Sequence, residues 1–310
     1  MNYEQIAGLA LPMSRLVMGA GLSLNGDVAL RHAAFDQFVA FGGNAFDTAH
    51  VYGNGDAERA LGAWLGLRDN RRRVLLIGKG AHPDEHWHAR INPHCIAMDL
   101  EESLERLRTA YIDLYLLHRD DPAVPVGEIV TCLNEHQRAG RIRAFGGSNW
   151  APERIAAANN YALEHNMAPF VASSPQFSLA RVSEFLFPGC LAVSTADRDW
   201  YVRRQFPLLA WSSQAQGFFS GRYSPNDRSN EKMARVWYSA ENFTRLDRAG
   251  ALGRERGVTA NTIALAYVLC QPFPTFAIIG PRSVDQLTAS MEALEIQLTP
   301  DEVRWLNLEH

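Results

Sequence analysis

The stretch NAFDTAHVYGNGDAERALGAWL, residues 44–65, passes from an apolar segment through a polar turn into a segment with helical spacing of apolar residues. Residues 44–48 are short and apolar, which is typical of a buried strand, and Asp47 stands at their end. Residues 57–66 follow the pattern of an amphipathic helix. The stretch therefore predicts one strand–helix unit whose connecting loop carries polar residues, among them Tyr52.

The same strand–helix unit recurs along the chain. We predict strands at residues 15–19, 44–48, 74–78, 112–117, 142–146, 171–174, 208–212 and 276–279. We predict helices at residues 27–41, 57–66, 94–109, 126–139, 152–166, 196–205, 260–270 and 284–294. Eight such units predict an α/β fold of the (β/α)8 TIM-barrel class, which typically needs about 250 residues. A doubly wound sheet uses the same units, but no glycine-rich phosphate turn follows the first strand, which favours the barrel.

Extra segments interrupt the repeat near its end. Residues 217–242 are polar and irregular, and we predict a long loop there, after the seventh strand. Residues 243–256 predict an additional helix, and residues 299–308 predict a last one, started by Thr299 with Pro300 in its first turn. Because no low-complexity linker divides the chain, we predict a single domain over residues 1–310.

Composition and charge exclude several classes of protein. The chain is 47% hydrophobic and 21% charged, as a globular protein is, and its net charge of −4 gives no reason to bind nucleic acid or an anionic membrane. No apolar run approaches the roughly 20 residues of a membrane span, and no signal-peptide pattern is evident. The four cysteines are scattered without a CxxC motif, which predicts reduced thiols and a cytoplasmic location. The oligomeric state stays open.

Titratable residues stand at the ends of three consecutive predicted strands. Asp47 and Tyr52 follow the second strand, Lys79 follows the third and His118 the fourth. Each alone has a plain structural interpretation, as a helix cap, a packed ring, a solvated cation or a core histidine. Because active sites of TIM barrels form where the carboxyl ends of the strands meet, the four side chains are expected to converge there.

Together the four residues predict proton donation to an oxygen. A nearby ammonium favours the phenolate, so Lys79 would bring the pKa of Tyr52 down from about 10 toward the working range. Asp47 would hold Lys79 in place, and a neutral His118 would orient a substrate carbonyl. No Ser or Cys with a neighbouring base offers a nucleophile, so we expect a hydride from a cofactor as the attacking group.

Seven motifs in order resemble those of the aldo-keto reductase superfamily. They are FDTAHVYGNGDAERALG, LIGKG, DLYLLHRDDP, GRIRAFGGSN, SSPQFS, LLAWSS and IIGPRSVDQL, and they extend over nearly the whole chain. The resemblance implies a catalytic tetrad of Asp47, Tyr52, Lys79 and His118, with Tyr52 as the proton donor. It further implies an oxidoreductase that reduces an aldehyde or ketone to the alcohol, or catalyses the reverse reaction, with a nicotinamide cofactor.

The resemblance also implies cofactor-binding positions. Ser148, Asn149 and Gln176 would bind the nicotinamide carboxamide, and Trp211 would stack on the ring. The positions implied for the rest of the cofactor are Ser212, Gln214, Gln216, Gly280, Arg282, Ser283, Gln286 and Ser290. Residues 212–217, SSQAQG, depart from the usual Ser-Pro-Leu, and Ser290 stands where relatives often have Asn.

Arg282 matches the position that binds the adenosine 2′-phosphate in the resembling family. Because a guanidinium binds phosphate in a forked geometry, this residue favours NADP(H), with NAD(H) as the alternative. The structural alternative for Arg282 is a solvated surface charge.

The loop GAHPDEHWHARINPHC, residues 80–95, is rich in histidine. A density of His and Cys side chains suggests a metal site, and some hydrolase barrels carry an H-x-H such as His86-Trp87-His88 at a strand end. Here the triplet lies seven residues beyond Lys79, with no rigid element to present it. We therefore expect no metal, and a substrate loop that places Trp87 over the pocket.

Arg119 directly follows His118, at a position where several relatives have an aromatic residue. With Asp120 and Asp121 beside it, the rim of the pocket is expected to be polar, which favours a sugar or another hydroxylated carbonyl compound as the small-molecule substrate. The alternative is that Arg119 and Asp120 form a rim salt bridge.

Two other functions stay open at this point. One is a cofactor-binding regulatory subunit on the same fold, like the reductase-related β subunits of potassium channels; the lack of an extended N-terminal segment favours the enzyme. The other is a metal-dependent hydrolase that uses the histidine loop. The sequence favours the oxidoreductase, because its residues match one by one.

Overall fold

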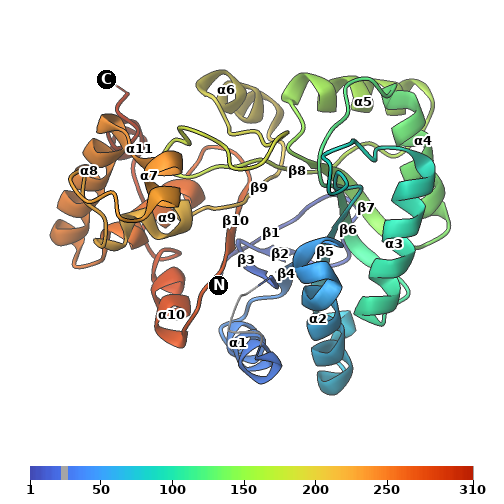
Figure 1. Cartoon of the computed structure of the whole chain (residues 1–310), viewed down its shortest axis with the longest axis horizontal. Helices are drawn as coiled ribbons and strands as arrows, with labels where there is room; N and C mark the ends of the chain where they lie inside the picture. The colour runs from blue at the N-terminus through green and yellow to red at the C-terminus, as the bar shows by residue number, and fades with distance from the viewer. Residues whose placement is uncertain (22–26, 310) are drawn as a thin grey trace.

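A computed structural model describes residues 1–21 and 27–309. Parallel strands close into an eight-stranded barrel, in which the last strand pairs with the first, Ile278 lying opposite Val17 (Figure 1). The strands are β3 (Leu16–Gly19), β4 (Ala45–Asp47), β5 (Leu75–Gly80), β6 (Ile112–Leu117), β7 (Ile142–Ser148), β8 (Ser173–Ser174), β9 (Leu208–Ala210) and β10 (Thr275–Ile279). The predicted (β/α)8 TIM barrel is confirmed.

Helices surround the barrel (Figure 1). They are α1 (Val28–Ala40), α2 (Asp56–Arg68), α3 (Pro93–Leu107), α4 (Val126–Arg138), α5 (Pro152–Glu164), α6 (Thr195–Arg204), α7 (Glu231–Trp237), α8 (Ala240–Arg256), α9 (Ala260–Leu269), α10 (Val284–Glu292) and α11 (Pro300–Leu306). Short 3-10 turns occur at η1 (Tyr52–Gly55), η2 (Arg71–Arg73) and η3 (Ala215–Ser220). Many of the helices begin with a side-chain N-cap. The Asn92 side chain accepts a hydrogen bond from the Cys95 amide before α3, and Thr299 forms a capping box with Glu302 before α11.

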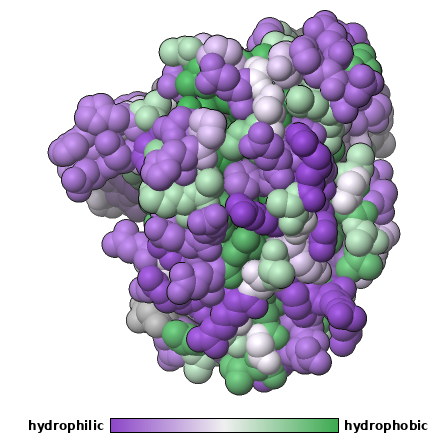
Figure 2. Space-filling model, turned by 90° about the vertical axis from the view of Figure 1, so that its right-hand side faces the viewer, coloured by the Kyte–Doolittle hydropathy of each residue, from purple (hydrophilic) through white to green (hydrophobic). Residues whose placement is uncertain are grey.

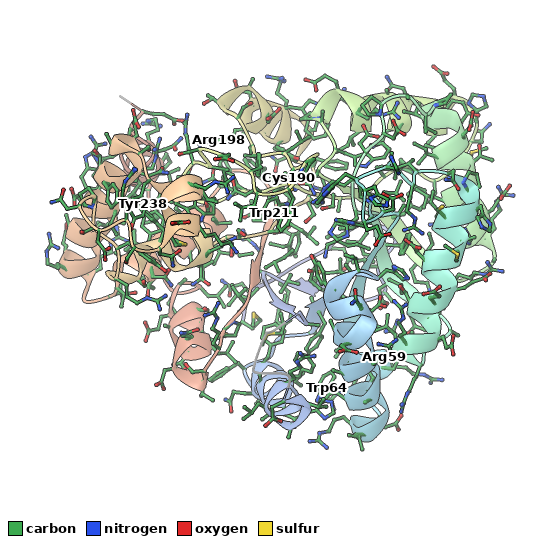
Figure 3. All side chains as sticks on the ribbon, in the orientation of Figure 1. Arg59, Trp64, Cys190, Arg198, Trp211 and Tyr238 are labelled. Carbon is green, nitrogen blue, oxygen red and sulfur yellow. The ribbon has the colours of Figure 1, made fainter. Side chains whose placement is uncertain are left out.

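Apolar residues form one core inside the barrel and another around it. The interior is filled by aliphatic and aromatic side chains of the strands, such as Leu75, Leu114 and Phe276. The outer layer packs helices on strands; Trp64 of α2 lies against Phe35 of α1, with ring centroids 5.5 Å apart, and Figure 3 shows it between these helices. Both layers follow the packed-core architecture of TIM barrels.

An N-terminal hairpin seals the barrel at the amino ends of its strands. Strands β1 (Tyr3–Glu4) and β2 (Met13–Ser14) pair in antiparallel fashion. Ile6, Leu9 and Met13 between and beside them are buried and belong to the interior core. The sequence analysis did not predict this hairpin, because each of its strands spans only two residues.

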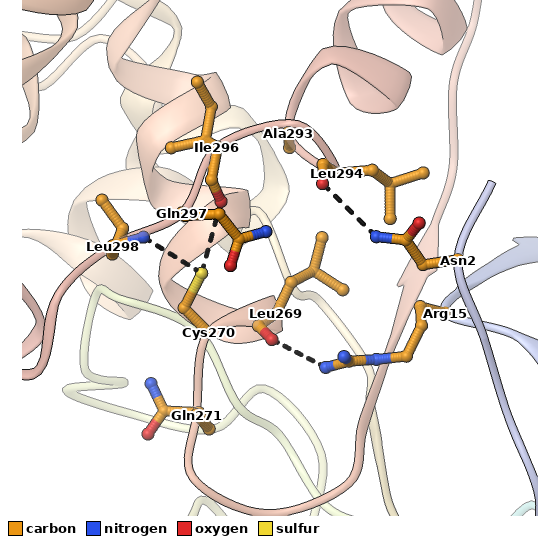
Figure 4. A pocket seen from close by; sticks show the side chains of 10 residues that line it. All are labelled: Asn2, Arg15, Leu269, Cys270, Gln271, Ala293, Leu294, Ile296, Gln297 and Leu298. Atoms are coloured by element: carbon orange, nitrogen blue, oxygen red, sulfur yellow. Dashed lines mark hydrogen bonds between the residues drawn. The ribbon is translucent and has the colours of Figure 1, made fainter.

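A small cavity of about 250 Å³ lies at the same amino end (Figure 4). Arg15 crosses it and donates hydrogen bonds to the carbonyl of Leu269 at 2.7 Å and to the carbonyl of Thr275 at 2.6 Å. The Cys270 thiol beside it donates to the Ile296 carbonyl. The bonds of Arg15 tie the residue before β3 to the end of α9 and to the first residue of β10.

The outer face that carries α3 and α4 is mainly hydrophilic, with apolar groups in small scattered areas (Figure 2). The apolar side chains of these helices, such as Ile96, Leu100 and Leu133, point inward and are buried. Among the described residues, no helix combines the length and the apolarity needed to cross a bilayer.

Three local predictions need correction. Residues 217–242 are not an irregular loop throughout, because η3 ends and α7 lies within them, and α8 begins at Ala240 rather than at residue 243. Met233, Val236 and Trp237 give α7 a buried face at helical spacing. The strand predicted at 171–174 is only two residues long in the structure. The sequence analysis also did not recognise the long connection between this strand and α6.

Candidate active site

A cavity of about 1350 Å³ opens at the carboxyl ends of the strands. Of the predicted site residues, its walls contain Asp47, Tyr52, Lys79, Trp87, His118, Arg119, Ser148, Asn149, Trp211, Ser212, Gln214, Gln216, Gly280, Arg282, Gln286 and Ser290. Gln176 and Ser283 do not line it: Gln176 Nε2 donates to Ser178 Oγ, and the Ser283 hydroxyl caps α10. The barrel thus collects residues from distant parts of the chain at one mouth.

Lys79 and Asp47 form a buried ion pair in the barrel wall. Lys79 Nζ lies 2.5 Å from Asp47 Oδ1 and also donates to the Thr48 carbonyl at 3.0 Å. Burial opposes the charge on Lys79, but Asp47 and Tyr52 outweigh it and raise the pKa of the ammonium. The lysine therefore stays charged at neutral pH and points at the tyrosine.

Tyr52 stands at the start of η1, directly after the loop that follows β4. Its hydroxyl lies 3.5 Å from Lys79 Nζ, and the ammonium is 5.0 Å from the ring centroid. Burial raises the pKa of Tyr52, and the charge of Lys79 acts against this without reversing it. From the sequence we expected Lys79 to lower the pKa of Tyr52. That expectation is wrong, because the pKa is raised overall. The phenol is protonated at neutral pH, as a proton donor must be.

His118 follows β6 and faces Tyr52, with ring centroids 5.6 Å apart. Burial lowers the pKa of His118 well below its ordinary value, and the charges of Lys79 and Arg119 lower it further. Neither of its ring nitrogens has a hydrogen-bond partner within residues 1–21 and 27–309, and Nδ1 is fully buried. A neutral imidazole with a free nitrogen can bind a substrate oxygen.

Aromatic rings continue from His118 to the rim of the cavity. His82 packs on His118 with centroids 4.8 Å apart, and Trp87 packs on His82 at 5.6 Å. Phe187, from the connection after β8, stacks on Trp87 at 6.0 Å and 29°. The predicted position of Trp87 at the pocket is supported, whereas Phe187 was missed because nothing in the sequence marks its loop.

Hydrogen bonds hold Asn149 and Ser148 at the next strand end. Asn149 has a left-handed backbone with φ of 58°, uncommon for a residue other than glycine. Its amide group donates to the His118 carbonyl at 3.2 Å and accepts from the Leu191 amide at 3.1 Å. Ser148 Oγ donates to the Ser174 carbonyl. The strain is held by contacts from three loops, which is common at ligand sites.

The far end of the cavity is basic. Arg222, Lys232 and Arg282 line it, are exposed, and form no salt bridge with any carboxylate in the described part of the chain. Trp211, near the centre of Figure 3, also lines the cavity, and its Nε1 is buried without a described partner. Sequence analysis missed Arg222 and Lys232, although two basic residues in a polar segment beside the expected cofactor were a usable signal.

The histidine loop does not gather around a common point. His86 and His88 are exposed, and His88 pairs with Asp84 at 3.0 Å. His82 is the only histidine of this loop that lines the cavity. In the part of the chain that the structure describes, no group of three His, Cys, Asp or Glu side chains is placed to hold a metal ion.

Comparison with known proteins places this site in context. The profile of the Aldo/keto reductase family matches residues 18–307. The chain is 29% identical over 320 residues to the uncharacterized oxidoreductase YrpG of Bacillus subtilis, covering 99% of this chain and 95% of that protein. It is 27% identical over 288 residues to an aryl-alcohol dehydrogenase (NADP+) of Phanerodontia chrysosporium, covering 88% and 74%. A solved thermostable aldo-keto reductase, in complex with the inhibitor epalrestat, has the same fold, with a TM-score of 0.74, 22% identity and 99% coverage of both chains.

Proposed function

The chain belongs to the aldo/keto reductase family, and we propose that it reduces a polar aldehyde or ketone to the alcohol with NADPH. It is an oxidoreductase that acts on carbonyl compounds and uses a nicotinamide cofactor. The choice of NADPH, the substrate class and the roles of the individual residues are the proposal.

The cavity fits a large anionic cofactor. Its volume of about 1350 Å³ exceeds the 300–1,000 Å³ of an ordinary small-ligand pocket, so it has room for a dinucleotide and a substrate. Arg222, Lys232 and Arg282 at its far end lack carboxylate partners among the described residues, so their charges are free to bind phosphates. Arg282 would hold the 2′-phosphate, and Trp211 would lie against the nicotinamide.

Tyr52 would donate the proton in this reaction. When bound, the nicotinamide supplies the hydride that the carbonyl carbon needs. A carbonyl oxygen placed against Tyr52 Oη would accept its proton, while the neutral imidazole of His118 donates a second hydrogen bond that orients the oxygen. Lys79, held by Asp47, would stabilise the phenolate that remains.

The observation that carries the proposal is the buried Lys79–Asp47 pair aimed at a protonated Tyr52 inside a cavity with a basic far end. The test is a fluorescence titration of NADPH and NADH into the wild type and Arg282→Ala. We expect micromolar NADPH binding that weakens about tenfold in the variant, ~1.4 kcal/mol, with NADH binding unchanged. Failure of both cofactors to bind would refute the proposal; equal loss for both would refute the role of Arg282.

A further inference from the structure

Arg119 is a buried cation that no carboxylate neutralises. It is 7% exposed, and its guanidinium donates to two neutral carbonyls, Pro188 O at 3.2 Å and His118 O at 2.8 Å. The third partner of the guanidinium is the thiol of Cys190, so none of its partners in residues 1–21 and 27–309 is a carboxylate. The predicted alternative, a salt bridge to Asp120, does not form, because Asp120 pairs with Arg154 at 3.1 Å.

The other titratable groups of the site do not neutralise Arg119, because each is either uncharged or already paired with another group. Lys79, another cation of the site, is already paired with Asp47. His82 and His118 are neutral, because burial lowers the pKa of each. The thiol of Cys190 is also neutral, because burial raises its pKa more than the neighbouring Arg119 lowers it. This end of the cavity therefore carries one uncompensated positive charge.

The charge of Arg119 lies where it can bind a group of the substrate. Arg119 lines the cavity together with Tyr52 and His118, and its charge acts on the pKa of both. It comes from the end of β6, whereas the basic residues proposed for the cofactor, such as Arg222 and Arg282, come from the segments after β9 and β10. An ion buried without a partner is costly, and a ligand anion that supplies the missing partner is bound correspondingly well.

We propose that the substrate carries an anionic group, a carboxylate or a phosphate, that binds the guanidinium of Arg119 while its carbonyl lies against Tyr52. This inference rests on the proposed carbonyl reduction and narrows its substrate class. A sugar acid or a sugar phosphate meets both this requirement and the expected polar rim. Nε and Nη1 of Arg119 donate to carbonyls, and the residue lines the cavity, so its fork of donors is held in place by the protein beside the substrate space.

Pairs of aldehydes, one with and one without an anionic group, test this proposal. The carboxylate pair is 4-carboxybenzaldehyde and 4-formylbenzamide; the phosphate pair is glyceraldehyde 3-phosphate and glyceraldehyde. We expect the wild type to show at least about tenfold higher kcat/KM for the anion of one pair. Arg119→Met should bring the ratio close to one, and Arg119→Lys should retain part of it. Arg72→Met, at an exposed arginine outside the cavity, should keep the wild-type ratio.

Calorimetry separates this proposal from the proposed function. Benzoate and benzamide cannot be reduced by the enzyme, so their binding reports the Arg119 site without turnover. We expect benzoate to bind at least about tenfold more tightly than benzamide, and the difference to vanish in Arg119→Met. Equal binding of benzoate and benzamide together with a kcat/KM ratio near one for both substrate pairs, or a preference for the anion that survives in a folded Arg119→Met, would overturn the anion site. No turnover of any carbonyl, with benzoate still bound through Arg119, would refute the reductase alone.

Discussion

The two ends of the barrel use the same strands for opposite purposes. At the amino end, Ile6, Leu9 and Met13 close the interior with apolar side chains, and the cavity there measures about 250 Å³. At the carboxyl end, the strands carry Asp47 and Lys79 into a cavity of about 1350 Å³. One end is built to exclude water and the other to hold charge, so stability and chemistry are separable by mutation.

Removal of the phenolic hydroxyl at the carboxyl end should have the largest effect. We expect Tyr52→Phe to lower kcat by about 10²–10⁴-fold, because general acid catalysis supplies a factor of this size. This corresponds to roughly 2.7–5.4 kcal/mol of activation free energy. Steady-state kinetics with NADPH measure it, and thermal unfolding should show a stable protein. Tyr161→Phe on α5 is the control. A Tyr52→Phe variant within tenfold of the wild type would exclude Tyr52 as the donor.

Removal of a buried apolar side chain at the amino end should reduce stability and leave catalysis unchanged. Ile6 is fully buried in the N-terminal hairpin, so Ile6→Ala should reduce the free energy of unfolding by about 2–5 kcal/mol. Below the unfolding transition, kcat should equal that of the wild type. Leu11→Ala, at a partly buried position of the same region, should cost less. A fall in kcat without a fall in stability would contradict the separation of the two ends.

His118 at the carboxyl end of the barrel should make the stability of the protein depend on pH. The pKa of His118 is depressed in the folded protein, so the unfolded chain binds the proton first, and stability is lost as the pH falls below about 6.5. Between pH 7 and pH 5 the wild type should lose up to about 2 kcal/mol through this residue.

Thermal unfolding at both pH values measures this loss. The stability advantage of the wild type over His118→Gln should shrink on acidification. The matched control, His165→Gln, alters an exposed histidine and should show no such change. A wild-type advantage that grows toward pH 5 would show that His118 is protonated in the folded protein.

The rim of the carboxyl end should give the smallest effect. Trp87 and Phe187 are 39% and 54% exposed and touch only across their stacked rings. Trp87→Ala and Phe187→Ala should each raise the substrate KM a few-fold, and a double-mutant cycle should reveal a coupling of about 0.5–1.5 kcal/mol. Strict additivity would mean that the rings do not act together over the pocket.

Strand ends could be predicted from the sequence, but contacts between loops could not. Apolar runs locate the ends of β4, β5 and β6, so the residues after them were expected at one mouth. Phe187 and Arg222 reach the cavity through long connections whose course depends on tertiary contacts. Likewise, the choice of Arg154 over Arg119 as the partner of Asp120 follows from the docking of α5, which has no local signal.

Closure of the barrel by β3 and β10 has a consequence for how the protein is made. The backbone pairing of these strands and the bonds of Arg15 join segments about 260 residues apart. At a synthesis rate of about 5–20 residues per second, roughly 13–50 s pass between the emergence of the two segments from the ribosome. During that interval the edge of β3 that later pairs with β10 has no partner strand and is open to pairing with other chains.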